Sequence, residues 1–399
     1  MKVLLVHNGY QRPGGEDVVF EQERSLLERA GHQVVLYHRS NWEVERYSGA
    51  KRLALARNTI WNSASRREIA KLIAREKPDV AHVHNTFVVV SPSIFSACQA
   101  GGVPVVLTLH NYRLLCPAAT FFRDGKICQE CVEHDLSRSI RHACYHNSRA
   151  TTAVVALMLT LNHWRRTWTD GVNRFVALTD FARKKFIEGG LPAEKILVKP
   201  NFVHPDPGAR TEGGEYAVFV GRLSPEKRVS TLLAAWGRLN SSQIPLLVIG
   251  TGPQQDELQA EASRLNLWAI RFEGQATRER AIAAIKRARF LVFSSEWYEN
   301  FPVTIGEAFA CSTPVICSKM GAMEEIVEDG RTGLHFMPGN AEDLAYKAEW
   351  AWSHPEAMRE MGAEARREYE TKYTAEKNYP LLMKIYEEAR TAGAYRCLG

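Results

Sequence analysis

Two glutamates in the last third of the chain have the spacing and the surroundings of a ligand site. Glu299 precedes, and Glu307 lies inside, a helix predicted from Val303 to Ala310, which follows an apolar strand pattern at residues 290–293. A helix start presents free backbone N–H groups and the positive end of its dipole, which suit a phosphate. Carboxylates accept hydrogen bonds from sugar hydroxyls. The stretch therefore predicts a site for a phosphorylated, hydroxyl-rich ligand; the alternative is that Glu299 caps the helix and Glu307 faces solvent.

This stretch, EWYENFPVTIGEAFA at residues 296–310, resembles the E-x7-E signature of retaining glycosyltransferases of family four. The resemblance implies the GT-B fold, an α/β architecture of two Rossmann-like, doubly wound parallel-sheet domains facing a central cleft. It also implies that Glu299 binds sugar hydroxyls and that Glu307 binds the ribose of a nucleotide-sugar donor. The helix start would contribute to donor binding through Asn300, Phe301, Pro302 and Val303.

A basic turn, GRLSPEKR at residues 221–228, separates another predicted strand from the helix that follows it. A strand, a glycine and a basic turn before a helix form a phosphate-binding layout. The turn resembles the family motif G-R-L-x-x-E-K. The resemblance implies that Gly221 approaches the donor and that Arg222 and Lys227 hold its diphosphate. The turn departs from the family at Arg228, where glycine is common.

Strands and helices alternate strictly through the rest of this half of the chain. Gly252 follows a strand predicted from Leu246 to Ile249, and Gly274 follows a strand predicted from Ala269 to Phe272. The alternation predicts a second parallel sheet with helices on both faces. By the resemblance, Gly252 takes part in donor binding and the loop at Gly274 forms the nucleobase pocket, without specifying the base.

The N-terminal half begins with a strand predicted from Lys2 to His7, a glycine pair at Gly14 and Gly15, and a helix. This is the first unit of a doubly wound α/β domain, and such sheets bind ligands at the carboxyl ends of their strands. The glycine pair lets the backbone approach a ligand without an intervening side chain; a plain turn is the alternative. By the resemblance, the loop lies against the donor diphosphate and the acceptor, with Glu16 on the acceptor side.

Two further strand patterns of this half end in histidine. One runs from Val80 to His84, and the other runs from Val103 to Leu109 and is followed by His110 and Asn111. A histidine in such a position is usually a hydrogen-bonded structural residue. The resemblance implies instead that His110 lies beside the transferred sugar, with His84 and Asn111 on the acceptor side.

An insert predicted at about residues 113–147 contains Cys116, Cys128, Cys131 and Cys144. A C-x2-C pair forms a rigid knuckle, and two further thiolates complete a tetrahedral, all-cysteine zinc site. Disulfides are rare in cytoplasmic proteins. The alternatives are a zinc site and free thiols packed in a loop; four thiolate ligands would make the metal structural and not catalytic.

The length of 399 residues suits two or three domains. We predict an acceptor-binding domain at residues 1–203, a donor-binding domain at residues 204–375 and a C-terminal helix at residues 376–399, which by the resemblance crosses back to the first domain. The longest apolar run, residues 153–161, is far shorter than the roughly 20 residues of a membrane span. The N-terminus also lacks the pattern of a signal peptide. We therefore expect a cytoplasmic protein.

The net charge of the chain is uneven. Residues 1–205 contain 28 Lys and Arg against 18 Asp and Glu, a net charge of +10, whereas the remainder carries −4. A basic surface attracts anionic partners, and the helix predicted from Ser148 to Thr169 contains HWRRTW, whose tryptophans and arginines suit lipid headgroups. Peripheral membrane contact through the basic half is therefore one hypothesis; the alternative is a solvated surface with a stripe packed against its own domain. No nucleic-acid partner is predicted.

Together these features predict a retaining glycosyltransferase that moves a sugar from a nucleotide-diphosphate sugar to a glycan or lipid-linked oligosaccharide in bacterial cell-surface polysaccharide assembly. No D-x-D metal pair lies in a suitable loop, so Arg222, Lys227 and the helix start are expected to stabilise the departing diphosphate without a cofactor. Two alternatives stay open. One is a nucleotide-sugar epimerase or hydrolase of the same fold, with Glu16 or Asp17 as the elimination carboxylate. The other is a non-catalytic sugar-nucleotide binding protein.

Overall fold

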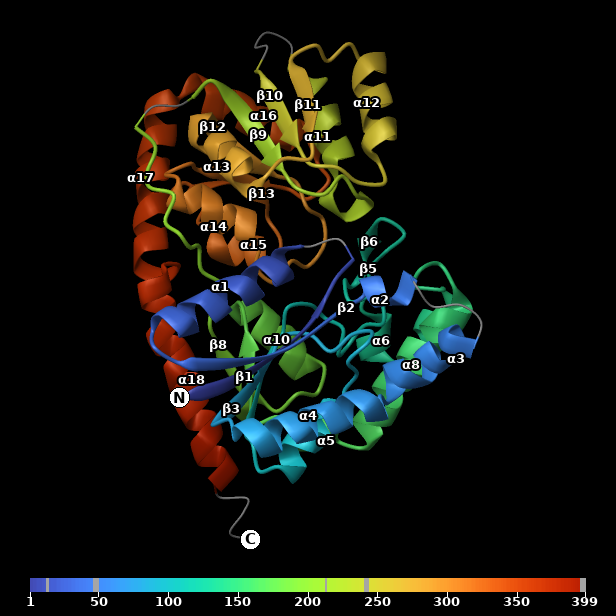
Figure 1. The fold of residues 1–399 in the computed structure, drawn as a ribbon. Coiled ribbons are helices and arrows are strands. Elements are labelled where there is room, and N and C mark those ends of the chain that lie inside the picture. The colour runs from blue at the N-terminus through green and yellow to red at the C-terminus, as the bar shows by residue number, and fades with distance from the viewer. Residues whose placement is uncertain (12–13, 46–49, 212–213, 240–243, 395–399) are drawn as a thin grey trace. The chain divides into compact units, whose positions relative to one another are not determined.

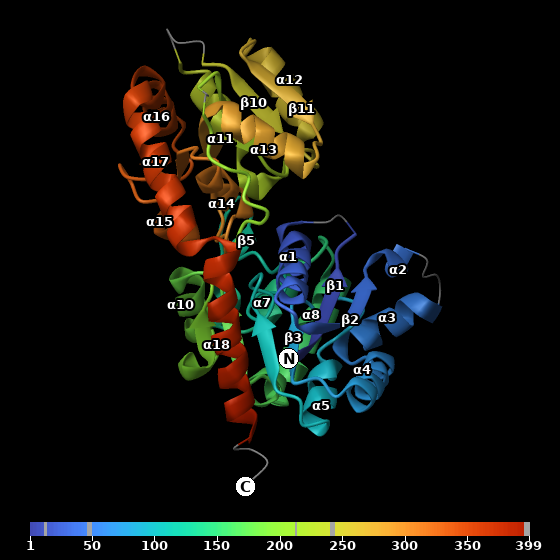
Figure 2. The ribbon, with the colours of Figure 1, turned by 60° about the vertical axis from the view of Figure 1, so that its left-hand side comes forward.

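The computed structural model describes residues 1–11, 14–45, 50–211, 214–239 and 244–394. The chain divides into two compact units, each built on its own parallel sheet with helices on both faces (Figures 1 and 2). Unit 1 comprises Met1–Phe121, Cys128–Pro200 and Asn378–Gly399, and unit 2 comprises Phe122–Ile127 and Asn201–Lys377. Residues 395–399 of the predicted C-terminal helix lie outside the described residues.

The sheet of unit 1 has six parallel strands in the order β2-β1-β3-β4-β7-β8. Their bounds are β1 Lys2–Gly9, β2 Gln33–Ser40, β3 Val80–Val83, β4 Val105–Thr108, β7 Arg174–Ala177 and β8 Ile196–Val198. Every residue of β3 and β4 is buried, as expected for parallel strands covered on both faces. The last strand of this sheet, β8, has three residues, which are too few to show a periodic pattern in the sequence.

Helices cover both faces of this sheet. Their bounds are α1 Gly15–Arg29, α2 Trp42–Glu45, α3 Ala50–Ile60, α4 Ser63–Glu76, α5 Ser93–Ala100, α6 Glu130–Glu133, α7 Ser137–Arg141, α8 Arg149–Trp164, α9 Thr167–Gly171, α10 Asp180–Glu188, the 3-10 turn η1 Ala193–Lys195 and α18 Ala375–Ala394. Helices α1 and α18 pack on the face of β1 that carries Val3 and Leu5, through Phe20 and Tyr386 among others. The helix predicted to reach residue 169 ends at Trp164 instead, since Arg166 adopts a left-handed φ of 54°.

Unit 2 repeats this architecture. Its sheet has the parallel order β11-β10-β9-β12-β13-β14, with β9 Tyr216–Val220, β10 Leu246–Ile249, β11 Ile270–Gly274, β12 Ala288–Phe293, β13 Val315–Ser318 and β14 Gly333–Phe336. Its helices are the 3-10 turn η2 Pro225–Lys227, α11 Val229–Trp236, α12 Gln255–Arg264, α13 Arg278–Arg287, α14 Val303–Ala310, α15 Gly321–Ile326, α16 Ala341–Ser353 and α17 Pro355–Lys372. A short antiparallel hairpin, β5 Phe122–Arg123 with β6 Lys126–Ile127, groups with this unit.

The predicted α/β fold with two doubly wound parallel sheets is confirmed. In each sheet the carboxyl ends of all strands meet at one edge, because all the strands are parallel. The loops that follow β9 and β12 in unit 2, and β1, β3 and β4 in unit 1, therefore gather at these edges. No helix of the described residues is long and apolar enough to cross a membrane.

Candidate functional site

Glu299 of unit 2 lies in the loop between β12 and α14, and only 7% of its surface is exposed. Its Oε1 atom accepts hydrogen bonds from the Lys227 ammonium, from the Ser295 hydroxyl at 2.9 Å and from the Trp297 indole N–H at 2.7 Å. The ammonium also lies 5.0 Å from the centre of the Phe293 ring. Lys227 ends the turn after β9, and Glu299 follows β12, the neighbour of β9 in the sheet. The structure thus joins two residues that the sequence motifs identified separately.

Glu307 lies inside α14 and is equally buried. Burial raises the pKa of its carboxyl group, and this shift is opposed by Arg278, whose Nε donates a hydrogen bond to Oε1 at 2.7 Å. Arg278 also donates to the His204 carbonyl at 3.1 Å. Sequence reasoning missed Arg278, although it is the first residue of α13 and follows the Gly274 loop assigned to the nucleobase. A ribose hydroxyl at Glu307 would share this carboxylate with the guanidinium.

Arg222, in contrast, is mostly exposed and pairs within its own turn. Its Nη2 atom donates to Glu226 Oε1 at 2.6 Å, and the Ser224 hydroxyl donates to the same oxygen at 2.7 Å. The side chain of Arg222 is 64% exposed. A diphosphate would therefore compete with Glu226 for this guanidinium.

The backbone conformation at Arg228 explains why glycine is common at this position of the motif. Its backbone is left-handed, with φ of 50° and ψ of 44°, a conformation that favours glycine. Its guanidinium bonds to the Gly125 carbonyl of the β5–β6 hairpin, and Nε lies 2.9 Å from Glu296 Oε2. These side-chain contacts offset the backbone cost, so the departure from glycine preserves the turn.

The predicted glycines differ in how much space a side chain would have at each position. A Cβ at Gly252 would lie 2.2 Å from the Leu223 carbonyl oxygen, so the close approach of two turns explains this glycine without a ligand. Gly274 ends β11 with a φ of 81°, and a Cβ there would meet no atom within 4 Å. A Cβ at Gly14 would also meet nothing within 4 Å, whereas one at Gly221 would lie 3.2 Å from the Phe219 ring. Gly274 and Gly14 are therefore the glycines that leave space beside the backbone.

The three residues just before α14 are buried. Phe301 is buried, with its ring centre 5.4 Å from that of Tyr373, so its side chain belongs to the core. Pro302 is the N-cap residue, and the helix begins at Val303. Asn300 is also buried.

In unit 1 the candidate acceptor-side residues come together at the carboxyl edge of the sheet. Glu16 Oε2 accepts hydrogen bonds from the Tyr10 hydroxyl at 3.1 Å and from the Asn111 amide at 3.3 Å. Burial and the nearby charge of Asp17 raise the pKa of Glu16 to about 8, against the effect of these two hydrogen bonds. Asp17 has a lowered pKa: burial alone would raise it, but hydrogen bonds from the His7 ring and from backbone N–H groups outweigh burial. The two neighbouring carboxyl groups thus differ in protonation near neutral pH.

His84 and His110 form a direct contact. His84 Nδ1 lies 2.9 Å from His110 Nε2, and the two rings are stacked with their centres 5.1 Å apart. Both side chains line a small cavity of about 60 Å³, together with Asn111, Phe87 and Arg113 among others. His110, whose functional role the resemblance implied, is therefore in contact with the residue assigned to the acceptor side.

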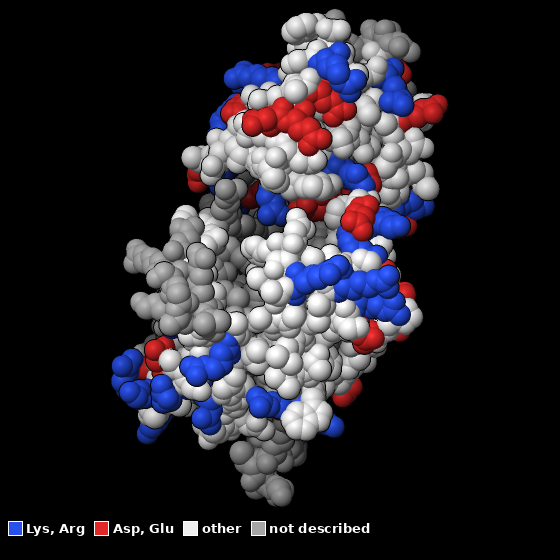
Figure 3. Space-filling model, turned by 90° about the vertical axis from the view of Figure 1, so that its right-hand side faces the viewer, with Lys and Arg blue, Asp and Glu red and all other residues white. Residues whose placement is uncertain are grey.

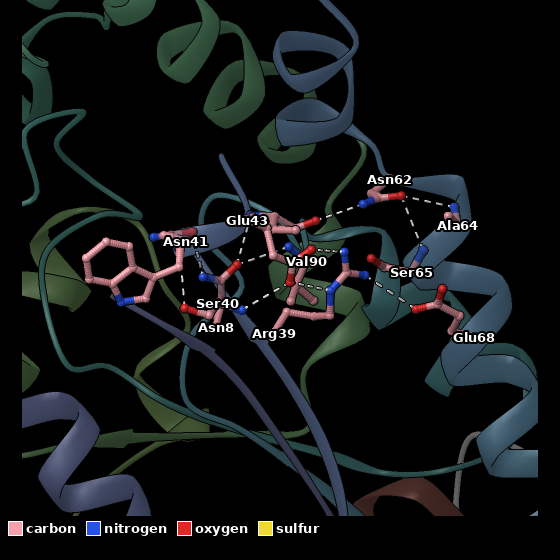
Figure 4. A network of polar contacts seen from close by, with 12 residues as sticks. Asn8, Arg39, Ser40, Asn41, Glu43, Asn62, Ala64, Ser65, Glu68 and Val90 are labelled. Atoms are coloured by element: carbon pink, nitrogen blue, oxygen red, sulfur yellow. Dashed lines mark hydrogen bonds and ion pairs between the residues drawn. The ribbon is translucent and has the colours of Figure 1, made fainter. Parts of the chain in front are cut away.

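A network of amide side chains fixes the loop that follows β3 (Figure 4). Asn8 Oδ1 accepts hydrogen bonds from the backbone N–H groups of Val89 at 2.8 Å and Val90 at 3.1 Å. Asn8 also donates to Asn41 Oδ1 at 2.8 Å, and Asn62 donates to the Val89 carbonyl at 2.7 Å. Since this loop carries Phe87 and its neighbours in the cavity wall, three separate elements hold one side of the candidate site.

The four cysteines of the insert lie near one another in unit 1, all as free thiols. Burial and the neighbouring sulfurs of Cys116, Cys144 and Cys128 raise the pKa of the Cys131 thiol to about 12. Nevertheless, no three of these sulfur atoms, all within the described residues, lie within 4.8 Å of one another. The zinc site therefore stays a prediction.

Within the described part of the chain, one set of three potential ligands does meet that distance: Glu23, His82 and His84. However, the ammonium of Lys199 already binds the Glu23 carboxylate. Both ring nitrogens of His82 are also engaged, Nδ1 with the Tyr386 hydroxyl at 2.8 Å and Nε2 with a threonine hydroxyl at 2.7 Å. A lysine thus occupies the place of a cation, and we do not assign a metal here.

Known proteins resemble this chain in sequence and in fold. Residues 13–207 match the model of Glycosyltransferase Family 4, and residues 203–368 match that of Glycosyl transferases group 1. The D-rhamnosyltransferase WbpZ of Pseudomonas aeruginosa is 30% identical over 41% of this chain and 42% of its own length. The phosphatidyl-myo-inositol mannosyltransferase of Mycobacterium leprae is 29% identical over 57% of this chain and 63% of its own length. The chain thus spans about half the length of the curated relatives it matches.

Among solved structures, Anabaena Alr3699/HepE in complex with UDP aligns with a TM-score of 0.66 at 17% identity, over 97% of this chain and 100% of its own. At this identity the likeness concerns the fold, which is GT-B. The two family models together extend from residue 13 to residue 368, across both units. The two halves of the chain thus resemble two glycosyltransferase families in sequence, and the whole chain has the GT-B fold.

Proposed function

We propose that the protein is a retaining glycosyltransferase, which moves a sugar from a nucleotide-diphosphate donor to a hydroxyl group of a glycan or lipid-linked acceptor. The observation that carries this proposal is the contact of Lys227 with Glu299 at the carboxyl edge of the second sheet. It places a cation for phosphate beside a carboxylate for sugar hydroxyls. The names of the matched relatives, a rhamnosyltransferase and a mannosyltransferase, support glycosyl transfer, and the UDP bound to the Anabaena protein supports a nucleotide donor.

In the proposed reaction, negative charge develops on the departing diphosphate while the sugar becomes oxocarbenium-like. Lys227, Arg222 and the N-terminus of α14 would stabilise this charge where it develops, so that no divalent ion is needed. Glu299 would bind hydroxyls of the sugar, and Glu307 would bind the ribose. The bond from the anomeric carbon to the diphosphate oxygen breaks, the bond to the acceptor oxygen forms on the same face, and a phosphate oxygen takes the acceptor's proton. In unit 1, His110 would bind a substrate hydroxyl, with Glu16, His84 and Asn111 on the acceptor side.

One observation favours a second candidate, the nucleotide-sugar epimerase or hydrolase. Glu16 and Asp17 are adjacent carboxyl groups whose pKa values shift in opposite directions, which is the pattern of an acid and base pair. Such an enzyme would release nucleotide from its donor at full rate without an acceptor. Nucleotide release that depends on acceptor concentration would exclude it.

We further propose that the protein acts at the inner face of a membrane, in assembly of a cell-surface polysaccharide. Leu157 and Trp164, 48% and 79% exposed, stand seven residues apart on α8 and therefore on one side of it. Beside them, the Arg165 guanidinium lies 5.2 Å from the centre of the Trp61 ring. Two apolar side chains next to an arginine suit a lipid headgroup layer.

The donor site can be tested by thermal unfolding with UDP, GDP, dTDP and ADP, each at about 100 times its dissociation constant. Binding at that level adds about 2.7 kcal/mol of stability, a rise in Tm of about 5–10 °C for a unit of this size. We expect one nucleotide to raise Tm, and the rise to be lost in Glu307→Ala. Glu215→Ala is the matched control, since Glu215 also pairs with an arginine in unit 2, at 2.6 Å, but has no assigned role. If no nucleotide raises Tm, the proposal is wrong.

A further inference from the structure

A buried ion pair lies under the candidate acceptor site of unit 1. Glu23 belongs to α1, and Lys199 follows β8; both side chains are 0% exposed. The Lys199 ammonium donates to Glu23 Oε1 and to the Asn378 side-chain oxygen at 3.0 Å. Burial alone would raise the pKa of Glu23, but the charge of Lys199 and the neighbouring His84 ring hold that pKa well below its usual range. Glu23 is therefore a buried carboxylate ion, and the proposed transfer chemistry assigns it no role.

A chain of ring contacts leads from this carboxylate to the candidate site. Glu23 Oε2 lies 3.3 Å from His84 Nε2, and His84 Nδ1 lies 2.9 Å from His110 Nε2. Burial lowers the pKa of His84, against the pull of Glu23, and lowers that of His110 well below its usual range. Both rings are therefore neutral, and each carries a single N–H.

We propose that the Lys199–Glu23 ion pair fixes the tautomers of His84 and His110, so that His110 presents an unprotonated Nδ1 as a hydrogen-bond acceptor. An ionised carboxylate has no proton and attracts one, so its charge favours the His84 tautomer with the N–H on Nε2, 3.3 Å from Glu23 Oε2. The neutral ring then leaves His84 Nδ1 as an acceptor, and His110 Nε2 must donate to it. This leaves Nδ1 of His110 bare, and in the described residues that atom makes no hydrogen bond.

His82 does not set this direction, although its Nδ1 atom lies 3.5 Å from Glu23 Oε2. Its two nitrogens bond to hydroxyl groups, of Tyr386 and of Thr108. A hydroxyl can donate or accept, so either tautomer of His82 is satisfied. Among the contacts of the described residues, the route through His84 is the one that joins a group of fixed protonation to His110.

The inference deepens the proposed function and rests on it for one point, the role of His110 toward substrate. In that role, the bare Nδ1 of His110 accepts a hydrogen bond from a hydroxyl group of the sugar or of the acceptor. It does not donate a hydrogen bond to a substrate oxygen. Glu23 and Lys199 act through His84 and are positioning residues. Their removal should lower kcat by about 10- to 100-fold, the usual effect of removing the partner that orients a functional histidine, with a smaller change in KM for the donor.

The tautomers can be measured without substrate. In the full-length protein labelled with ¹⁵N at histidine, two-bond ¹H–¹⁵N correlation spectra distinguish Nε2–H, Nδ1–H and imidazolium forms. Signals are assigned with His84→Asn and His110→Gln. We expect the Nε2–H form for both residues near pH 7. An Nδ1–H or imidazolium signal for His110 would overturn the proposal whatever reaction the protein catalyses.

Variants of the ion pair test its cause. In Lys199→Met the unpaired Glu23 should become protonated and donate to His84, which reverses both tautomers and gives His110 an Nδ1–H signal. If that variant does not fold, Lys199→Met with Glu23→Gln removes both charges, and mixed tautomers are expected. Tyr386→Phe is the control, because it removes a buried hydrogen bond of the same core without touching the Glu23–His84–His110 route. An unchanged His110 tautomer after loss of the ion pair would refute the proposal. Changed tautomers with an unchanged kcat would support the tautomer proposal and refute the role of His110 in transfer.

Discussion

At the scale of single residues, Lys227 is the strongest candidate for stabilising the leaving group. Replacing it by alanine should lower kcat by about 100-fold or more, since a cation at developing charge acts chiefly in the transition state. The donor dissociation constant should change much less. Ser295 and Trp297 still hold the Glu299 carboxylate in Lys227→Ala, so the fold should survive. Steady-state kinetics and calorimetry give the two quantities. Lys319→Ala, at an exposed lysine of the same unit, is the control, and equal losses of donor binding and turnover would count against the role.

Glu16 allows a prediction about pH. Its pKa in the folded protein is about 8, against an ordinary value of 4.5, so the folded state keeps a proton that the unfolded state releases between these values. Its contribution to stability is therefore complete below about pH 4.5 and is lost as the pH rises to about 8. Glu16→Gln keeps a neutral side chain at every pH. The free energy of unfolding of this variant should therefore rise relative to that of the wild type between pH 5 and pH 8.

Urea unfolding at pH 5, 6, 7 and 8 measures this difference. Glu21→Gln serves as the control, because Glu21 is an exposed glutamate of the same helix. Its profile should run parallel to that of the wild type. A parallel profile for Glu16→Gln as well would show that Glu16 is ionised in the folded protein.

At the scale of elements, the cysteine insert has little means of stabilising itself. Its regular structure in unit 1 amounts to α6 and α7, of four and five residues. Short elements without a core of their own are commonly held by a metal or by disulfides. We expect about one zinc ion per chain, measured by elemental analysis of the purified protein, since a divalent cation stabilises thiolates that otherwise repel one another.

Cys131→Ser should lose the zinc and lower Tm, whereas Cys98→Ala, at a buried cysteine of α5 outside the insert, should keep the zinc. Equal metal content in the two variants would leave the alternative, free thiols packed in a loop.

At the scale of the whole molecule, the N-terminal half carries the excess of basic residues, 28 Lys and Arg against 18 Asp and Glu in residues 1–205. On the face that Figure 3 shows, Lys and Arg side chains form separate groups with uncharged surface between them. Membrane contact would then depend on the apolar side chains of α8 as well as on charge. We expect the protein to sediment with vesicles of equal parts phosphatidylglycerol and phosphatidylcholine, less so at high salt, and several-fold less with Leu157→Ala and Trp164→Ala combined.

Trp268→Ala is the matched control for this experiment. Trp268 belongs to unit 2 and is 84% exposed, close to the 79% of Trp164, but lies far from α8 in sequence. Equal binding of all three proteins would contradict a specific role for α8.

Local patterns predicted much of this fold. The strand β10 and the helix α14 have the predicted bounds, because continuous apolar runs and helical periodicity depend only on neighbouring residues. Strict alternation of these elements then restricts the architecture to parallel sheets covered by helices. The pattern failed where local signals are weak, as in the three-residue strand β8, or where one backbone conformation decides, as at Arg166.

The sequence by itself thus determined the fold class and the candidate residues for a site that takes a phosphorylated sugar. Tertiary structure alone decided which distant residues meet. Lys227 and Glu299 are 72 residues apart and Lys199 and Glu23 are 176 apart, yet each pair is in contact. Such pairs produce no periodic pattern in the sequence, because contact between distant residues depends on strand order and on the shared carboxyl edge of a sheet. For the same reason Arg278 and the ion pair beneath His84 became visible only once the chain was folded.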